Sequence, residues 1–138
     1  MRRTFRATVV FAVCAVLAAL QGPLRRSLAA STDEPETVLV SYRPQPGQEA
    51  ELLQILRNAR ATLRRLDLVD ESPYVLARTM DPGGAVRFVE IFTWKSEEIP
   101  DHAPAEVRAE WDRMQKLVQP RDGRPGIEIQ PVQLLPEK

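Results

Sequence analysis

After residue 36, runs of residues typical of strands follow one another in turn with runs in which apolar residues recur at the spacing of a helix. The order of these runs constrains the fold more than any other feature of this sequence. Residues 37–42 (Thr-Val-Leu-Val-Ser-Tyr) are mostly β-branched and aromatic, which predicts a strand. From Gln48 the apolar residues recur at three- and four-residue steps, which predicts an amphipathic helix of about five turns. The apolar stripe of this helix consists of Leu52, Leu56, Ala59, Leu63 and Leu66.

Two further β-rich runs predict a hairpin. After a polar connection at residues 67–72, residues 74–80 and 85–94 flank Asp-Pro-Gly-Gly at 81–84, a turn sequence. A two-residue loop would place Arg78 opposite Arg87, and like charges destabilise a cross-strand pair. We therefore expect a three-residue loop with Gly84 in the left-handed conformation. This register puts Arg78 diagonal to Glu90 on the same face of the sheet.

The remaining sequence predicts a second long helix and a final strand. Residues 96–101 are expected to form one helical turn, and the longer helix should begin at Ala103 or Pro104. Its apolar stripe consists of Val107, Trp111, Met114 and Val118. After a break at residues 120–125, residues 126–135 alternate as a strand. Pro131 lacks a backbone N–H, so this strand should lie at an edge or contain a bulge.

The order β-α-β-β-α-β predicts an α+β fold, the ferredoxin-like split sandwich. Its two helices cover one face of the sheet and leave the other face bare. In residues 85–94, one face carries Val86, Phe88, Glu90, Phe92 and Trp94, and the other carries Val89 and Ile91 beside Arg87 and Thr93. A bare face with so many apolar residues needs a cover. The simplest cover is a second copy of the chain, so we expect a homodimer that forms a closed α+β barrel.

The first thirty residues have the pattern of an export signal peptide. Residues 1–6 are basic, residues 7–20 are apolar apart from Thr8, and residues 27–30 are mostly small. A helix of that apolar length rises about 21 Å, less than the roughly 30 Å of a bilayer core. We expect cleavage after Ala29 or Ala30, and a periplasmic or secreted protein. The alternative is an uncleaved membrane anchor. Residues 31–36 are then a flexible spacer, and residues 37–138 form the folded domain.

Charge and cysteine content exclude several classes of function. Residues 1–30 hold five of the 19 basic residues and no acidic residue, so the remaining chain has 14 bases, 19 acids and a net charge of −5. Nucleic-acid binding needs a basic face, so no nucleic-acid partner is expected. The only cysteine is Cys14, which leaves no disulfide framework or thiolate cluster. No spacing of a zinc site, phosphate loop or catalytic triad is present, and no metal is expected.

Three segments carry a resemblance to a known superfamily. Residues 38–52 resemble the opening strand, turn and helix of dimeric α+β barrel proteins, residues 88–96 resemble their strand ending in E-x-x-x-W-x-S, and residues 107–114 resemble their last helix. The group is the antibiotic biosynthesis monooxygenase-like superfamily. The resemblance implies a dimer with a pocket between sheet and helices. Some members oxidise polycyclic phenols with O₂ and no cofactor.

Another branch of that superfamily degrades haem with an asparagine, a tryptophan and a histidine. Trp94 and His102 match the last two, but the first strand has no asparagine, and Asn58 is expected in mid-helix. Haem degradation is therefore not expected, and no cofactor is predicted.

Glu90 and His102 are the candidate catalytic residues. Glu90 lies in mid-strand between Phe88 and Phe92, and an apolar environment raises the pKa of a carboxyl so that it can act as a base near neutral pH. The alternative is a buried ion pair with Arg78. His102, the only histidine, could act as a general base or ligate a metal or haem iron. Its alternative role is that of an exposed or capping residue.

The candidate ligand-binding residues are mostly aromatic. Tyr42 and Tyr74 can donate hydrogen bonds to a carbonyl group, and the full set is Tyr42, Tyr74, Arg78, Phe88, Phe92, Trp94 and Trp111. Packing in the core is the alternative for each aromatic side chain. The predicted function is an exported protein that binds a small aromatic molecule, or a cofactor-independent monooxygenase-like protein. The alternative is a non-catalytic dimeric interaction module with a filled core.

Overall fold

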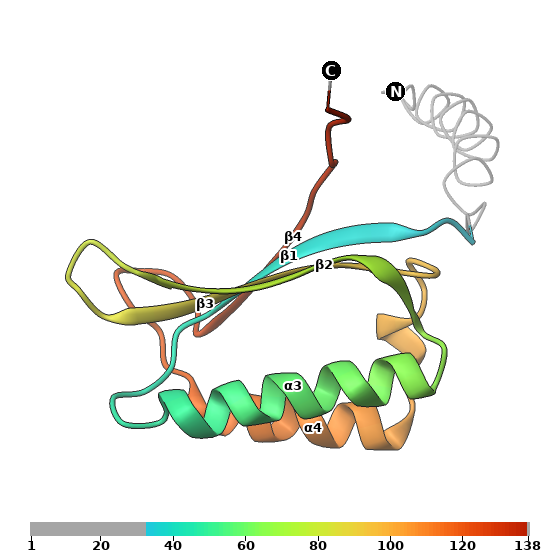
Figure 1. Cartoon of the computed structure of the whole chain (residues 1–138). Coiled ribbons are helices and arrows are strands. Elements are labelled where there is room, and N and C mark those ends of the chain that lie inside the picture. The colour runs from blue at the N-terminus through green and yellow to red at the C-terminus, as the bar shows by residue number, and fades with distance from the viewer. Residues whose placement is uncertain (1–32, 138) are drawn as a thin grey trace, which may run out of the picture. The chain divides into compact units, whose positions relative to one another are not determined.

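The computed structural model describes residues 33–137, so the predicted signal peptide lies outside the described residues. The described chain contains four strands and two long helices in the predicted β-α-β-β-α-β order (Figure 1). The elements are β1 (Glu36–Tyr42), α3 (Glu49–Arg65), β2 (Val69–Met80), β3 (Val86–Trp94), the short 3₁₀ helix η1 (Pro100–His102), α4 (Ala105–Leu117) and β4 (Ile127–Pro131). None of the helices within residues 33–137 is both long and apolar enough to cross a membrane.

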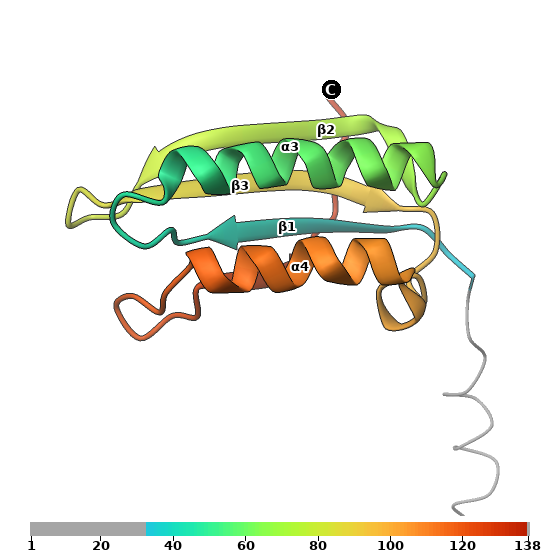
Figure 2. The ribbon, with the colours of Figure 1, turned by 90° about the horizontal axis from the view of Figure 1, so that it is seen from below.

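The four strands form one antiparallel sheet in the order β2-β3-β1-β4. Helices α3 and α4 lie side by side on one face of this sheet, and no helix of residues 33–137 lies over its other face (Figures 1 and 2). This is the ferredoxin-like α+β arrangement that the sequence predicted. The proline-containing strand β4 lies at an edge, as expected from the missing N–H of Pro131.

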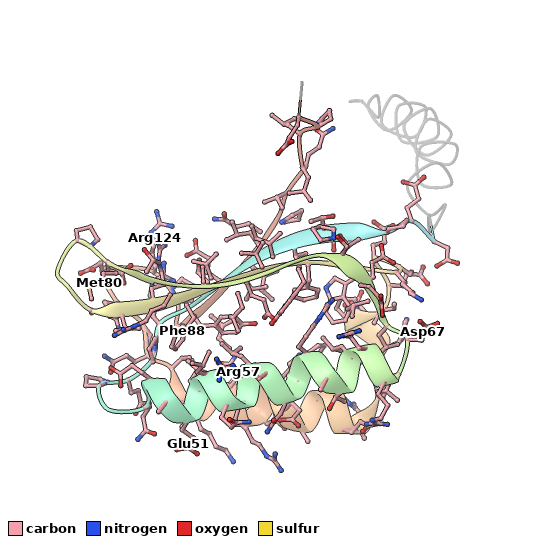
Figure 3. All side chains as sticks on the ribbon, in the orientation of Figure 1. Glu51, Arg57, Asp67, Met80, Phe88 and Arg124 are labelled. Carbon is pink, nitrogen blue, oxygen red and sulfur yellow. The ribbon has the colours of Figure 1, made fainter. Side chains whose placement is uncertain are left out.

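The core lies between the sheet and the two helices. Helix α3 buries Leu52 and Leu56, which are 0% and 1% exposed, while Glu51 lies on the side of α3 away from the sheet (Figure 3). Helix α4 contributes Val107 and Met114. Phe88 extends from β3 into the space above α3 (Figure 3). The three- and four-residue spacing seen in the sequence thus places one stripe of each helix against the sheet.

The hairpin has the predicted three-residue loop. Met80 pairs with Val86 and Arg78 with Phe88, so Arg78 is diagonal to Glu90. The loop closes through two backbone hydrogen bonds of 2.8 Å, from Asp81 N to Ala85 O and from Gly84 N to Asp81 O. Gly84 has φ +83°, a conformation that a side chain disfavours.

Two predicted strand boundaries were wrong by four residues or more. Strand β2 begins at Val69 and not at residue 74, because Val69 is buried and pairs with Trp94. The polar residues that follow Val69 stay extended, and Arg60 donates a 2.7 Å hydrogen bond to the carbonyl of Asp70. Strand β4 ends at Pro131 and not at residue 135, and the apolar side chain of Leu135 is 82% exposed. The alternation of apolar residues alone therefore overestimated the length of β4.

A buried ion network holds the end of the sheet nearest the hairpin loop. Arg121 Nη1 donates to Asp81 Oδ2 at 3.0 Å, and Arg87 Nε lies 3.3 Å from Asp81 Oδ1. Arg43, which is 2% exposed, lies 3.9 Å from Asp81 and donates at 3.0 Å to Glu128 Oε2. This hydrogen bond lowers the pKa of Glu128 below its ordinary value. The network joins the end of β1, the hairpin loop and the segment between α4 and β4.

Removing the carboxylate of Asp81 should destabilise the fold. The Asp81→Asn substitution leaves three arginines around a neutral amide, so we expect the free energy of unfolding to fall by about 3 kcal/mol in urea titration. The control is Glu71→Gln, which removes a carboxylate that is 85% exposed and paired with Arg64. It should change stability by no more than about 0.5 kcal/mol. Equal effects of the two substitutions would contradict a structural role for the network.

Candidate functional site

A cavity of about 410 Å³ lies between α4 and the sheet, beside β1 and β4. Its volume is within the range of small-molecule pockets. Of the nine sequence-predicted site residues, four line it, namely Tyr42, Phe92, Trp94 and Trp111. The lining residues that sequence analysis did not single out as site residues are Glu36, Val38, Val40, Glu97, Pro100, Asp101, Met114, Gln115, Ile127 and Ile129. The aromatic residues singled out in the sequence thus include part of the cavity lining. Its aliphatic and acidic lining residues could be identified only from the fold.

Strand alternation and helix periodicity explain why these residues meet. Val38, Val40 and Tyr42 occupy every second position of β1, so their side chains share the face that α4 covers. Trp111 and Met114 are three residues apart on α4 and therefore lie on one side of that helix. Pairing of β1 with β4 adds Ile127 and Ile129 to the same face.

Three aromatic rings form one wall of the cavity. The rings of Phe92 and Trp94 meet edge to face, with centroids 5.0 Å apart and an interplanar angle of 72°. Trp94 and Trp111 meet in the same way at 6.4 Å and 88°. Edge-to-face contacts of this kind hold rings in fixed orientations. The wall therefore presents a preorganised aromatic surface to the cavity.

Glu90 is buried behind the cavity and does not line it. Its carboxylate, which is 5% exposed, accepts a 2.9 Å hydrogen bond from the Tyr42 hydroxyl. Tyr74 also makes a side-chain hydrogen bond to Glu90. Burial raises the pKa of Glu90, and these two hydrogen bonds lower it by less. Glu90 can therefore act on a molecule in the cavity only through Tyr42.

The two tyrosines are held in their neutral form. Burial raises the pKa of Tyr42 well above its ordinary value, and the charge of Glu90 adds to this effect. Burial, followed by the charge of Glu90, raises the pKa of Tyr74 to about 12. Both hydroxyls therefore keep their protons at neutral pH and can donate hydrogen bonds.

Arg60 is a further member of this cluster and lies outside the apolar stripe predicted for α3. The structure buries it to 6% exposure, and its guanidinium lies 4.3 Å from the centroid of the Tyr74 ring. Its Nε and Nη1 atoms have no hydrogen-bond partner among the described residues. The positive charge of Arg60 lowers the pKa of Glu90, though by less than burial raises it. Its position next to Ala59 of the apolar stripe is the one sequence signal for this burial.

The other predicted residues lie away from the cavity. The alternative of a buried ion pair between Glu90 and Arg78 is wrong, because Arg78 is exposed and the hydrogen-bond partners of Glu90 are tyrosines. Phe88 is 3% exposed and packs in the core, and Tyr74 is half-buried beside Glu90. His102 is exposed on η1 and does not line the cavity. Within residues 33–137, no three acidic, histidine or cysteine side chains could hold a metal ion together.

Comparisons with known proteins identify the fold. No family model matches the sequence, and no curated protein matches it. Rv0793 of Mycobacterium tuberculosis has a TM-score of 0.55 and 16% identity, over 75% of this chain and 98% of that chain. A Chloroflexus aurantiacus protein, provisionally named an antibiotic biosynthesis monooxygenase, has a TM-score of 0.54 and 18% identity, over 76% and 97%. A conserved Bacteroides thetaiotaomicron protein, named a possible oxidoreductase, has a TM-score of 0.55 and 11% identity, over 73% and 98%.

These comparisons confirm the predicted fold class. The chain has a ferredoxin-like α+β fold similar to that of Rv0793 and of the Chloroflexus aurantiacus protein. At identities of 11–18%, the likeness concerns the fold and carries no site residue from one chain to another.

The raised pKa of Glu90 should make stability depend on pH. The folded protein binds this proton more tightly than the unfolded chain, so stability is lost as pH rises from the unfolded pKa through the folded pKa. The variant Glu90→Gln lacks this titration. Its stability relative to the unsubstituted chain should therefore increase as pH rises above about 4.5, the ordinary pKa of this carboxyl, by about 1.4 kcal/mol per pH unit separating the two pKa values. Urea titrations at each pH measure this difference.

Glu98→Gln is the matched control, because Glu98 is exposed and does not line the cavity. Its stability difference from the unsubstituted chain should stay nearly constant over the same pH range. A Glu90→Gln difference that stays constant, or decreases as pH rises, would contradict the raised pKa.

Proposed function

We propose that this chain is an exported protein that binds a small aromatic molecule in the cavity between α4 and the sheet. The observation that carries the proposal is a cavity of about 410 Å³ walled by Phe92, Trp94 and Trp111. The three rings are held in edge-to-face contacts and do not need to reorient when a ligand binds. This arrangement favours a flat aromatic ligand. The open volume beside Trp94 also argues against the alternative of a filled core. The tripartite pattern of residues 1–30 supports export.

The bare face of the sheet supports a homodimer as the working form. Val75 is 45% exposed on β2, and Val89 and Ile91 are half-buried on β3. All three are at strand positions that alternate with those facing the helices. A second copy of this face would remove the apolar side chains of both chains from water.

A second candidate function is cofactor-independent monooxygenation in the same cavity. The hydrogen bond from Tyr42 to Glu90 favours it, because it connects a buried base to a cavity wall. The substrate would lose a proton through Tyr42 to Glu90 and supply the electrons for O₂. One oxygen atom then enters the substrate and the other leaves as water. His102, which is exposed, has no part in this route. If the route operates, Tyr42→Phe should retain ligand and lose oxygen uptake.

The aromatic wall should determine ligand affinity. We expect Trp111→Ala to weaken binding of 2-naphthylmethanol by about tenfold, since it removes one ring of the wall. Isothermal titration calorimetry measures the dissociation constant. The control is Leu117→Ala, which shortens a partly buried side chain of the same helix that does not line the cavity. If both variants bind equally well, the cavity is not the binding site.

The assembly should depend on the bare sheet face. Native mass spectrometry of the protein from its export compartment should give a dimer of chains that begin near Ser31. Val75→Glu places a charge in the contact and should produce monomers, because an unpaired charge is costly to bury. Ala109→Glu, on the exposed side of α4, should leave the dimer intact. Monomers of the unsubstituted chain, or dimers that tolerate Val75→Glu, would contradict this interface.

A further inference from the structure

We propose that the ligand of the α4 cavity is an aromatic cation, whose positive group lies at the end of the cavity next to Trp94. The proposal rests on the proposed function, because it concerns the same cavity. Among residues 33–137, the charged residues that line the cavity are Glu36, Glu97 and Asp101, and no lysine, arginine or histidine of this part of the chain lines it. A ligand in this cavity therefore meets the negative charges of Glu36 and Asp101 at the wall.

The three carboxylates gather at one end of the cavity. Glu36 pairs directly with Trp94 across β1 and β3, and Glu97 and Asp101 follow Trp94 in the chain. Tyr42 and Ile127, which pair with each other, line the opposite end. Apart from Gln115, the other lining residues are apolar. The cavity thus has an acidic end and a tyrosine end, separated by the length of β1.

Backbone hydrogen bonds fix the acidic end in place. Glu97 N donates to Glu34 O at 2.9 Å, which holds the segment after β3 against the start of β1. Asp101 N donates to Glu98 O at 3.1 Å within the turn that leads into η1. The positions of Glu97 and Asp101 are therefore set before a ligand arrives, which reduces the ordering cost of binding.

Neither Glu36 nor Asp101 forms an ion pair with any of residues 33–137. Elsewhere in this part of the chain, carboxylates such as Asp81 and Glu128 lie next to arginines. Like charges gathered at one end of a cavity repel each other, and a bound cation relieves that repulsion.

The tryptophans add a second attraction for a cation. The face of an indole ring carries negative electrostatic potential, so an ammonium group near Trp94 or Trp111 gains a cation–π interaction. The same surfaces and carboxylates disfavour a phenolate or a carboxylate. The net charge of −5 over residues 31–138 should also attract cations during encounter. Aromatic amines in their ammonium form combine the flat apolar part and the positive group that this cavity fits.

Three probes of matched shape test the charge preference. 2-Naphthylmethylammonium, 2-naphthylmethanol and 2-naphthoate are titrated by calorimetry into the purified protein expressed from the full chain. We expect the ammonium probe to bind about tenfold more tightly than the alcohol, with naphthoate the weakest. Raising the salt concentration to 0.5 M should reduce this preference, because the carboxylates are partly exposed.

Substitution of the acidic end tests the residues. In the double variant Glu36→Gln with Asp101→Asn, the preference for the ammonium probe over the alcohol should fall to about twofold. Glu98→Gln is the control, since this exposed carboxylate lies in the same segment outside the cavity lining, and it should keep the full preference.

The outcomes separate the two proposals. Binding of the alcohol with no preference for the ammonium probe would overturn this inference and leave the binding function in place. A preference that survives the double substitution would overturn the assignment to Glu36 and Asp101. Failure of all three probes to bind would overturn the proposed function together with the inference.

Discussion

The carboxylate of Asp81 connects parts of the chain that the hydrophobic core alone would not hold in register. It lies next to Arg43, Arg87 and Arg121, which come from the end of β1, from β3 and from the segment after α4. Arg121 also donates to the carbonyls of Pro44 and Val86. Ion pairs of this kind add little net stability against an apolar replacement, but losing one partner leaves buried charge uncompensated. The network therefore acts mainly as a constraint on geometry.

The ion network also affects the shape of the cavity, because Arg43 contacts the start of β4. Arg43 N donates at 2.7 Å to the carbonyl of Gly126, and its guanidinium holds Pro125 O and Glu128. These contacts place the start of an edge strand that has only one neighbour in the sheet. Ile127 and Ile129 of the same strand form part of the cavity wall. The shape of the cavity thus depends on an ion network that lies outside it.

The fold was predictable from the sequence because local signals agreed with one another. Apolar periodicity identified the helices, and repulsion between Arg78 and Arg87 selected the correct hairpin register. The beginning of β2 was not predictable from local polarity, because the burial of Val69 depends on Trp94 from another strand.

The site was less predictable than the fold. Aromatic residues indicated four of the residues that line the cavity, because aromatic side chains on strands and helices tend to be buried together. Arg60 was missed because its hydrogen bond reaches from α3 to β2, across a turn that no periodicity describes. Glu36 and Asp101 were missed because each lies in a polar stretch of sequence, and only pairing of Glu36 with Trp94 brings such stretches together at the cavity. Contacts between distant segments were thus the part that sequence patterns could not supply.

The sequence distances within the ion network have a consequence for folding kinetics. Arg43 contacts residues 82 and 85 positions further along the chain, and Arg121 contacts residues 40 and 77 positions before it. Such contacts form only after the intervening chain has closed, and closing long loops costs conformational entropy. We therefore expect the network to form late in folding. Interactions formed at that stage set how slowly a folded domain opens rather than how quickly it forms. We thus expect these arginines to slow unfolding of the domain more than they speed its folding.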